Sequence, residues 1–383
     1  MSWRNICPMD EKVKFIAAIK QKHYYMSEIC EKVGISRKTG YKWLKRYENE
    51  GPKGLYERSR ARIIQKNRTS DSQLKLILDT KQRFQHWGPK KIKCWLETNY
   101  TNKKFPAAST IGNILQKHAM VEHRKKRKNI PPYTKPFINC TRSNDVWSAD
   151  FKGQFHMGNK SYCYPLTITD NFSRYIIACD GYLSPTFKNV KKSFIRAFKE
   201  FGLPIAIKTD NGTPFSSVSA GGLSQLSIWW IKLGICPERI APGHPEQNGR
   251  HERMHRTLKK ATTNPPQYSI KSQNNVFEDF INEFNNIRPH EALANKTPAS
   301  IYTKSKQGYP SKIPEVTYPD DCLVRKVRTN GCIKFNGNLI YVSKLLYGEP
   351  VGIVKIKDDC WNIRYSYLSI GMLNEKRASS IRA

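Results

Sequence analysis

Apolar residues recur at helical spacing near the start of the chain. Val13, Ile16 and Ile19 would lie along one side of a helix, and residues 27–33 predict a second, shorter helix. We therefore predict that the first segment, residues 1–65, is helical.

A tight turn is predicted to join residues 27–33 to a further helix. Gly34 can supply the positive φ of the turn, and Ser36 can cap a helix that runs to about Tyr47. This pattern is typical of a helix-turn-helix DNA-binding domain, although an ordinary helical hairpin has the same spacing. In the DNA-binding case the second helix enters the major groove, and four residues of its first turns are predicted to contact DNA: Arg37, Lys38, Thr39 and Lys42.

Residues 66–122 show a similar helical pattern. Leu74, Ile77 and their neighbours predict one helix, the sequence Trp87-Gly88-Pro89 breaks the chain, and Ser109 precedes another apolar helix. We predict a second helix-turn-helix or winged-helix domain here.

A basic, proline-containing stretch follows at residues 123–138. Its composition predicts a linker between domains that lies along DNA. The predicted DNA contacts in this linker are Arg124, Lys125, Lys126 and Arg127.

Alternating apolar positions replace the helical pattern after residue 139. Strands are predicted within residues 145–157, 162–168, 175–180 and 205–209, with a helix at 185–201. This order predicts a mixed α/β domain over residues 139–305.

The last segment, residues 306–383, contains short strands separated by turns. Strands are predicted at 324–327, 333–335, 339–342, 351–356 and 361–365, with turn signals such as Asn330-Gly331 and Asn336-Gly337 between them. A small β-barrel is the predicted fold.

The net charge indicates the partner. The 383 residues include 66 Lys and Arg but 31 Asp and Glu, which gives +35. A charge of this size favours binding to double-stranded DNA over a merely solubilising basic surface.

Several classes of protein are disfavoured by what the sequence lacks. No apolar stretch approaches the ~20 residues that span a bilayer, so we predict no membrane partner. The ten cysteines include no CxxC pair, which disfavours a zinc site or a disulfide scaffold. There is no GxxxxGK[ST] loop, so no nucleotide cofactor is predicted. A cytoplasmic protein with reduced thiols is the expected result.

Three carboxylates occupy unusual places in so basic a chain. Asp150 lies in the first predicted strand of the α/β domain, Asp210 ends a later strand, and Glu252 lies on a basic helix. Arg256 and Lys259 follow Glu252 at i+4 and i+7, so they share its face of the helix. Oxygen ligands of this kind favour Mg²⁺ or Mn²⁺, and two such ions can support an in-line displacement at phosphorus.

The motifs around these carboxylates resemble those of a known family. They are Trp147-Ser148-Ala149-Asp150, then Asp210-Asn211-Gly212 with Phe215, then Pro245 to Glu252, and later Asn286 to Leu293 with Thr297-Pro298. In this order the chain resembles insertion-sequence transposases of the DDE superfamily, which have a catalytic core of the retroviral-integrase type.

The resemblance implies an RNase H-like catalytic core in which Asp150, Asp210 and Glu252 are catalytic residues and metal ligands. Two Mg²⁺ ions would bind, and Mn²⁺ could substitute. Glu246 is an alternative third ligand, but the spacing from Pro245 through Gly249 favours Glu252.

The resemblance also implies a function. The chain would recognise the terminal inverted repeats of a mobile element, cleave their 3′ ends and transfer them into target DNA. It would act as a dimer or larger assembly in a bacterial or archaeal cytoplasm, associated with the nucleoid. Further DNA contacts are predicted on the helix that carries Glu252: Arg250, Arg253, Arg256, Lys259 and Lys260.

Two other functions remain open at this point. A DNA-binding regulator could retain the fold without catalysis, and a nuclease of the RNase H type would cut DNA without joining it. His251 and His255 could assist the substrate or a metal, or only position a loop. Trp229 and Trp230 could stack on bases, although packing in the core is the better prediction.

Overall fold

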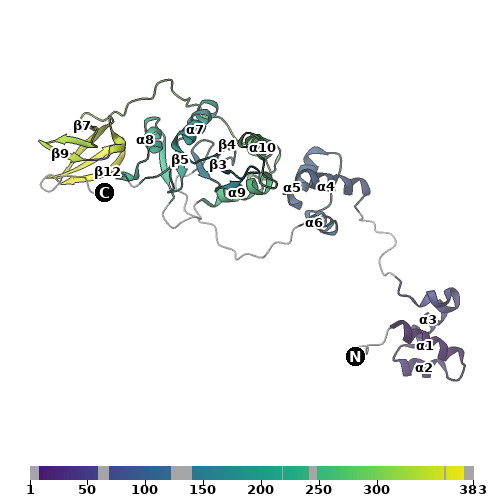
Figure 1. Cartoon of the computed structure of the whole chain (residues 1–383). Helices are drawn as coiled ribbons and strands as arrows, with labels where there is room; N and C mark the ends of the chain where they lie inside the picture. Colours follow the sequence, from purple (N-terminus) through teal and green to yellow (C-terminus); the bar gives the residue numbers. More distant parts are fainter. Residues whose placement is uncertain are drawn as a thin grey trace. The chain divides into compact units, whose positions relative to one another are not determined.

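The structure is a computed structural model that describes residues 8–58, 69–121, 140–217, 219–240, 248–357 and 359–374. The chain divides into two compact units, residues 1–68 and 69–383 (Figure 1). Two predicted features lie outside the described residues: the basic run Arg124 to Arg127, and Glu246.

The first unit contains the predicted helix-turn-helix. Its helices are α1 (Pro8–Lys20), α2 (Met26–Val33) and α3 (Arg37–Glu50). Gly34 has a φ of 71°, and the Ser36 hydroxyl accepts the Thr39 backbone N–H at 3.2 Å. The turn and the cap are therefore confirmed, and α3 runs three residues beyond its predicted end.

A small apolar core holds these three helices together. Phe15, Ile29, Trp43 and Leu55 are buried in it. Helix α3 lies close to α2 at Gly40, where an added Cβ would lie 2.6 Å from Cys30 Sγ. A glycine is required here because there is no room for a side chain.

The second unit begins with another group of three helices: α4 (Asp71–Arg83), α5 (Pro89–Asn99) and α6 (Ala108–Lys117). The predicted break at Trp87-Gly88-Pro89 lies between α4 and α5, and Pro89 is the first residue of α5. Trp87 is buried. Ser109 lies in the first turn of α6 and not before it, because the residue that precedes the helix is Ala107. This domain meets the following one where the Trp87 indole N–H donates to Glu283 at 3.0 Å.

The α/β domain contains one mixed sheet. Its strands are β1 (Val146–Phe151), β2 (Phe155–His156), β3 (Tyr162–Asp170), β4 (Ile176–Tyr182), β5 (Ala206–Thr209) and β6 (Cys236–Arg239). The strand order is β2-β3-β1-β5-β6, and β4 pairs with β3. β3 runs antiparallel to β1 and β4, whereas β1, β5 and β6 are parallel.

Helices cover this sheet, and their labels can be followed in Figure 1. They are α7 (Phe187–Phe201), α8 (Gln225–Lys232), α9 (Gly249–Thr262) and α10 (Ile270–Asn282). One core joins α7 and α8 to residues such as Trp147 and Ile168, and another joins α9 and α10 to residues such as Cys163 and Cys179. Phe194 and Phe198 lie one turn apart on α7, so both reach the first of these cores.

Three elements had not been predicted from the sequence. β6 contains Pro237 and two charged residues, a composition that disfavours a strand. Its position at the edge of the sheet explains why proline is tolerated there. The other two are α10 and β12 (Leu368–Asn374), which lie beyond the predicted helix and strand patterns.

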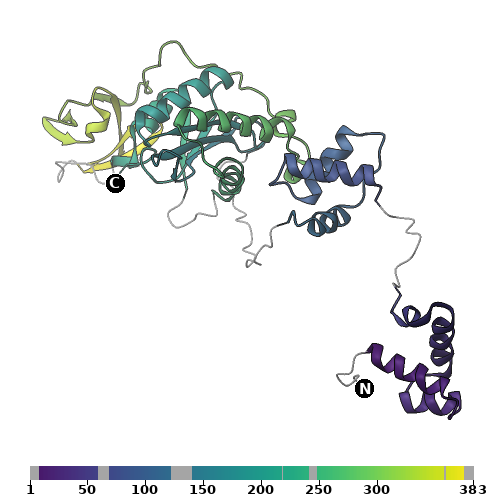
Figure 2. The ribbon, with the colours of Figure 1, turned by 45° about the vertical axis from the view of Figure 1, so that its right-hand side comes forward.

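The C-terminal segment contains two sheets, coloured yellow-green to yellow in Figure 2. The larger comprises β7 (Leu323–Lys326), β10 (Pro350–Lys357), β11 (Cys360–Tyr365) and β12, and the smaller pairs β8 (Cys332–Phe335) with β9 (Asn338–Tyr341). The two sheets share one apolar core, which also includes residues of α8. No closed barrel is seen among the strands that the structure describes, so the barrel remains a prediction.

A membrane-spanning helix and a disulfide scaffold are two features that the sequence disfavours. None of the helices among the described residues is long and apolar enough to cross a bilayer. The nine cysteines in the described part of the chain are all free thiols.

Two helical glycines should respond in opposite ways to alanine. Gly40→Ala should destabilise α1 to α3 by about 1–3 kcal/mol, because the new methyl group overlaps Cys30. Gly112→Ala on α6 should be neutral or stabilise by about 0.5–1 kcal/mol, since its Cβ would meet only Pro89 at 3.4 Å. Amide hydrogen exchange within each group of helices measures both effects, and equal protection of α3 in Gly40→Ala and wild type would contradict the first.

Candidate active site

Strand pairing brings the two aspartates side by side. β1 and β5 are parallel neighbours, and Ala149 pairs with Thr209 in their register. Asp150 directly follows Ala149 on β1, and Asp210 directly follows Thr209, the last residue of β5. Both therefore lie at the same end of the sheet.

The face of the sheet that carries Asp150 is polar. Side chains alternate between the two faces of a strand, so Asp150 and Ser148 share a face. Their partners across the antiparallel pair with β3 are Thr167 and Thr169. The opposite face carries apolar residues such as Trp147, so a helix that packs on the polar face must meet hydroxyls and a carboxylate.

Helix α9 packs on this polar face. Its buried side carries His251, Met254, His255 and Leu258, and Glu252 lies on its exposed side. At its start the Asn248 amide donates a hydrogen bond to Asp150 Oδ2 at 3.0 Å. The N-terminal end of α9 is thereby tied to the aspartate of β1.

The surroundings of Asp150 and Asp210 disfavour the charged form of both carboxylates. Burial raises the pKa of Asp150 to about 7, with further increases from the charge of Asp210 and, less strongly, of Glu252. The Asn248 amide offsets part of this increase. Burial also raises the pKa of Asp210, while the Gly212 backbone N–H lowers it in part. The charges of Asp210 and Glu252 thus add to the effect of burial on Asp150.

The loop after β5 fits closely around Asp210. A Cβ at Gly212 would lie 2.9 Å from Asp210 Oδ2, so a larger residue would displace the carboxylate. The Asn211 amide donates to the Ile240 carbonyl at 2.9 Å, which joins this loop to the end of β6. These two residues therefore shape the turn that follows Asp210.

The donor set fits a divalent cation. Asp210 Oδ1 is buried and has no hydrogen-bond partner among the described residues. Oxygen ligands with uncompensated negative charge suit a hard cation such as Mg²⁺ or Mn²⁺. Asp150, Asp210 and Glu252 are the residues that would hold it.

Two histidines also lie beside Asp150. Ligand atoms of Asp150, His251 and His255 are all within 4.8 Å of one another. However, both Nε2 atoms contact the Thr167 hydroxyl, at 2.6 Å and 2.7 Å. Burial lowers the pKa of His251 to about 3 and that of His255 to about 2, so both rings are neutral. Their hydrogen bonds favour a supporting position over metal ligation.

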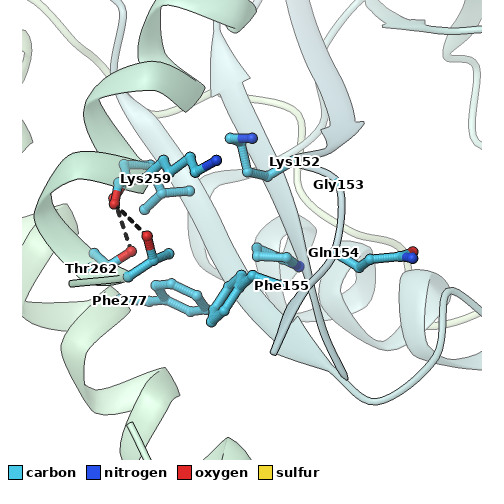
Figure 3. A pocket seen from close by; sticks show the side chains of 10 residues that line it. Lys152, Gly153, Gln154, Phe155, Lys259, Thr262 and Phe277 are labelled. Carbon is cyan, nitrogen blue, oxygen red and sulfur yellow. Dashed lines mark hydrogen bonds between the residues drawn. The ribbon is translucent and has the colours of Figure 1, made fainter. Parts of the chain in front are cut away.

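A pocket beside Asp150 adds a cation that the sequence analysis missed. Lys152 and Lys259 line it, and Figure 3 shows their side chains extending toward one another above Phe155 and Phe277. Burial and the neighbouring Lys259 charge lower the pKa of Lys152. The sequence signal for Lys152 was its position two residues after Asp150. Side chains two residues apart in an extended chain point to the same side.

The other predicted DNA contacts on α9 are exposed. They are Arg250, Arg253, Arg256, Lys259 and Lys260. The Arg250 guanidinium also donates a long hydrogen bond of 3.4 Å to the Asn171 carbonyl.

On α3 the predicted contacts differ from one another. Arg37, Lys38 and Lys42 are exposed, whereas Thr39 is half-buried. The Thr39 hydroxyl lies 2.9 Å from that of Ser36 and so takes part in the helix cap.

The two tryptophans of α8 are buried. Trp229 is 5% exposed and Trp230 is 1% exposed, and both pack against the aromatic residues of α7. Core packing, the preferred prediction, is confirmed.

Family comparisons agree with this arrangement. Residues 141–245 and 233–298 match the family described as "Integrase core domain". Residues 11–63 match "Helix-turn-helix domain", and residues 39–115 match "Homeodomain-like domain". The α/β domain is therefore an integrase core, and helix-turn-helix domains precede it.

Two curated relatives come from bacterial insertion elements. The chain is 29% identical over 192 residues to the uncharacterized 39.2 kDa protein of insertion element IS476 from Xanthomonas euvesicatoria, which covers 49% of this chain and 53% of the relative. It is 26% identical over 190 residues to the uncharacterized 31.7 kDa protein of IS407 from Burkholderia multivorans, which covers 49% of this chain and 65% of the relative. The matched region thus spans between about half and two thirds of these relatives.

A solved structure is also similar. It is the HTLV-2 integrase catalytic core domain in complex with magnesium, at 18% sequence identity and a TM-score of 0.35. The similarity covers 43% of this chain and 99% of that chain.

Removing the Asp150 charge should stabilise the metal-free chain at neutral pH. The folded-state pKa of about 7 exceeds the ~3.9 of an unfolded chain. The stabilisation from this proton is therefore complete below about pH 4 and is lost as the pH rises through about 7. We expect Asp150→Asn to raise the free energy of unfolding by about 1–3 kcal/mol at pH 8, and by less at pH 5.

Thermal and urea unfolding in a chelator at both pH values measure this effect. Asp279→Asn, at an exposed position of α10, is the matched control and should change little. A difference between Asp150→Asn and wild type that does not grow from pH 5 to pH 8 would contradict the interpretation.

Proposed function

Because the chain carries the integrase core of insertion-sequence transposases behind helix-turn-helix domains, we propose that it is a DNA transposase. In this proposal it recognises the terminal inverted repeats of a mobile element, cleaves at their 3′ ends and transfers those ends into target DNA. The observation that carries the proposal is the parallel pairing of β1 and β5, which brings Asp150 and Asp210 to the same end of the sheet beside α9.

Asp150, Asp210 and Glu252 are the proposed catalytic residues and metal ligands. Two Mg²⁺ ions, or Mn²⁺ in their place, would activate the attacking oxygen and stabilise the leaving oxygen. The unpartnered, buried Asp210 Oδ1 supports this assignment.

Other side chains of the chain would bind and orient the DNA. Lys152, Arg256 and Lys259 lie near the carboxylates and would contact the phosphates on either side of the reacting bond. The Asn248 amide would orient Asp150, to which it already donates a hydrogen bond. Exclusion of free water by a bound strand would strengthen each of these contacts.

The helical domains would find the ends of the element. The proposed contacts on α3 are Arg37, Lys38, Thr39 and Lys42. The Thr39 hydroxyl also takes part in the helix cap with Ser36. The linker contacts Arg124 to Arg127 remain part of this proposal. The two C-terminal sheets, whose shared core supports a small barrel, would assist DNA binding or assembly.

The reaction also defines the proposed partners. Two element ends and a target must be held together, so a dimer or larger assembly on double-stranded DNA is expected. Association with the nucleoid in a bacterial or archaeal cytoplasm follows from these partners.

Substitution of the acidic residues tests the chemistry. Asp210→Asn and Glu252→Gln should each lower cleavage and joining of element-end DNA by roughly 10³-fold or more, because several kcal/mol of charge stabilisation are lost. Binding to the same DNA should be retained. Gel-based assays of 3′-end cleavage, and of joining with a pre-cut end that carries a free 3′-hydroxyl, measure the two steps.

The controls separate this function from its rivals. Asp279→Asn and Glu246→Gln should remain active. If instead Glu246→Gln is inactive and Glu252→Gln is active, Glu246 is the third metal ligand. A nuclease would cut without joining the pre-cut end. A regulator would bind DNA and show no dependence of any reaction on Asp210, which would contradict the proposal.

DNA affinity should depend strongly on salt. If ~6–10 phosphates are neutralised, the affinity should fall by roughly 10³- to 10⁵-fold between 50 and 200 mM salt. Fluorescence anisotropy with labelled end DNA measures this slope. An affinity that is the same at both salt concentrations would refute the role assigned to the +35 charge.

A further inference from the structure

One buried hydroxyl lies between the sheet and α9. Thr167 on β3 is fully buried, and its Oγ1 donates to the Asp150 backbone carbonyl at 3.1 Å. The same oxygen is 2.6 Å from His251 Nε2 and 2.7 Å from His255 Nε2. Two strands and a helix therefore meet at a single oxygen atom.

The number of available protons determines the direction of these bonds. A hydroxyl has one proton and two lone pairs. The Thr167 proton goes to the Asp150 carbonyl, which can only accept, so both imidazoles must donate Nε2–H to Thr167. In the neutral His251 ring Nδ1 is then an acceptor, and the Thr169 hydroxyl donates to it at 3.1 Å. Every contact in the cluster is satisfied by one consistent arrangement.

Helix spacing extends this cluster to the Asp150 carboxylate. Asn248, His251 and His255 are related by three and four positions, so they follow one side of the start of α9. Asn248 binds the Asp150 carboxylate, and the two histidines reach the Asp150 carbonyl through Thr167. The residue is held at both its side chain and its main chain.

Apolar packing alone would not fix the rotation and height of α9 so closely. Met254 and Leu258 bury the same side of α9, but apolar contacts are non-directional and allow a helix to rotate or slide. Hydrogen bonds of 2.6–3.1 Å have a narrow range of geometry. Glu252 directly follows His251, so the rotation that these bonds set also determines where the Glu252 carboxylate points.

We propose that Thr167, His251 and His255 are positioning residues that fix the rotation and height of α9, so that Glu252 faces Asp150 and Asp210. The inference rests on the proposed function for its catalytic consequence. In this proposal the three residues contact neither DNA nor a metal, and they act through the placement of the carboxylates.

Thr167→Val tests this role, because valine keeps the shape and removes the hydroxyl. We expect the folded variant to bind Mn²⁺ about 10- to 100-fold more weakly, with kcat for end cleavage reduced by a similar factor and the Kd for DNA unchanged. Thr167→Ser should restore both values. Isothermal titration calorimetry with Mn²⁺ and single-turnover cleavage measure them on the full chain.

Thr80→Val is the matched control. Thr80 is also a buried threonine, and its hydroxyl donates only to the Leu76 carbonyl of its own helix. This variant should lose some stability and keep wild-type Mn²⁺ affinity. If Thr167→Val has the Mn²⁺ affinity and kcat of wild type, the inference is overturned.

A second pair of variants decides the question if Thr167→Val does not fold. His255→Gln can still donate a proton toward Thr167, whereas His255→Leu cannot. We expect His255→Gln to bind Mn²⁺ more tightly than His255→Leu, and equal affinities would overturn the inference. If the wild-type chain neither cleaves nor joins DNA, the proposed function fails, while the Mn²⁺ titrations still decide the role of Thr167.

Discussion

The burial of the Asp150 carboxylate beside Asp210 is the constraint on which this structure depends. Asp150 and Asp210 lie at the same end of the sheet, and burial, with a smaller contribution from the charge of Asp210, raises the pKa of Asp150 to about 7. Such an arrangement is unfavourable for the folded chain unless a cation or a proton compensates it. It persists because strand pairing, apolar packing and the hydrogen bonds of Thr167 and Asn248 fix the surrounding sheet and helix.

The two faces of the sheet contribute different interactions to the fold. On one face Trp147, Phe194 and Phe198 form a large apolar core with α7 and α8, which supplies stability. On the other face the hydroxyls of β3 meet the histidines of α9. Buried polar contacts contribute less stability than apolar packing, but they restrict the helix to one register. The acidic site thus lies on the face of the sheet where directional hydrogen bonds replace part of the apolar packing.

Much of this could be predicted from local sequence signals. Gly34 and Ser36 define a turn and a cap within a few residues, and the structure has both. The motifs around Asp150 and Asp210 predicted strand ends, and parallel pairing of β1 and β5 brings them together. β6 was missed because Pro237 and its charged neighbours are tolerated only at a sheet edge, a position that the sequence of the strand does not reveal. Thr167 and Lys152 were missed because their significance depends on elements more than eighty residues away, His251 and Lys259.

The most direct test of the account is to observe the cation. A crystal of the full chain soaked with Mn²⁺ and measured at the manganese absorption edge locates the ion by its anomalous scattering. We predict a peak coordinated by oxygens of Asp150, Asp210 and Glu252. A peak bound elsewhere, or one at the aspartates with Glu252 directed away from it, would contradict the account.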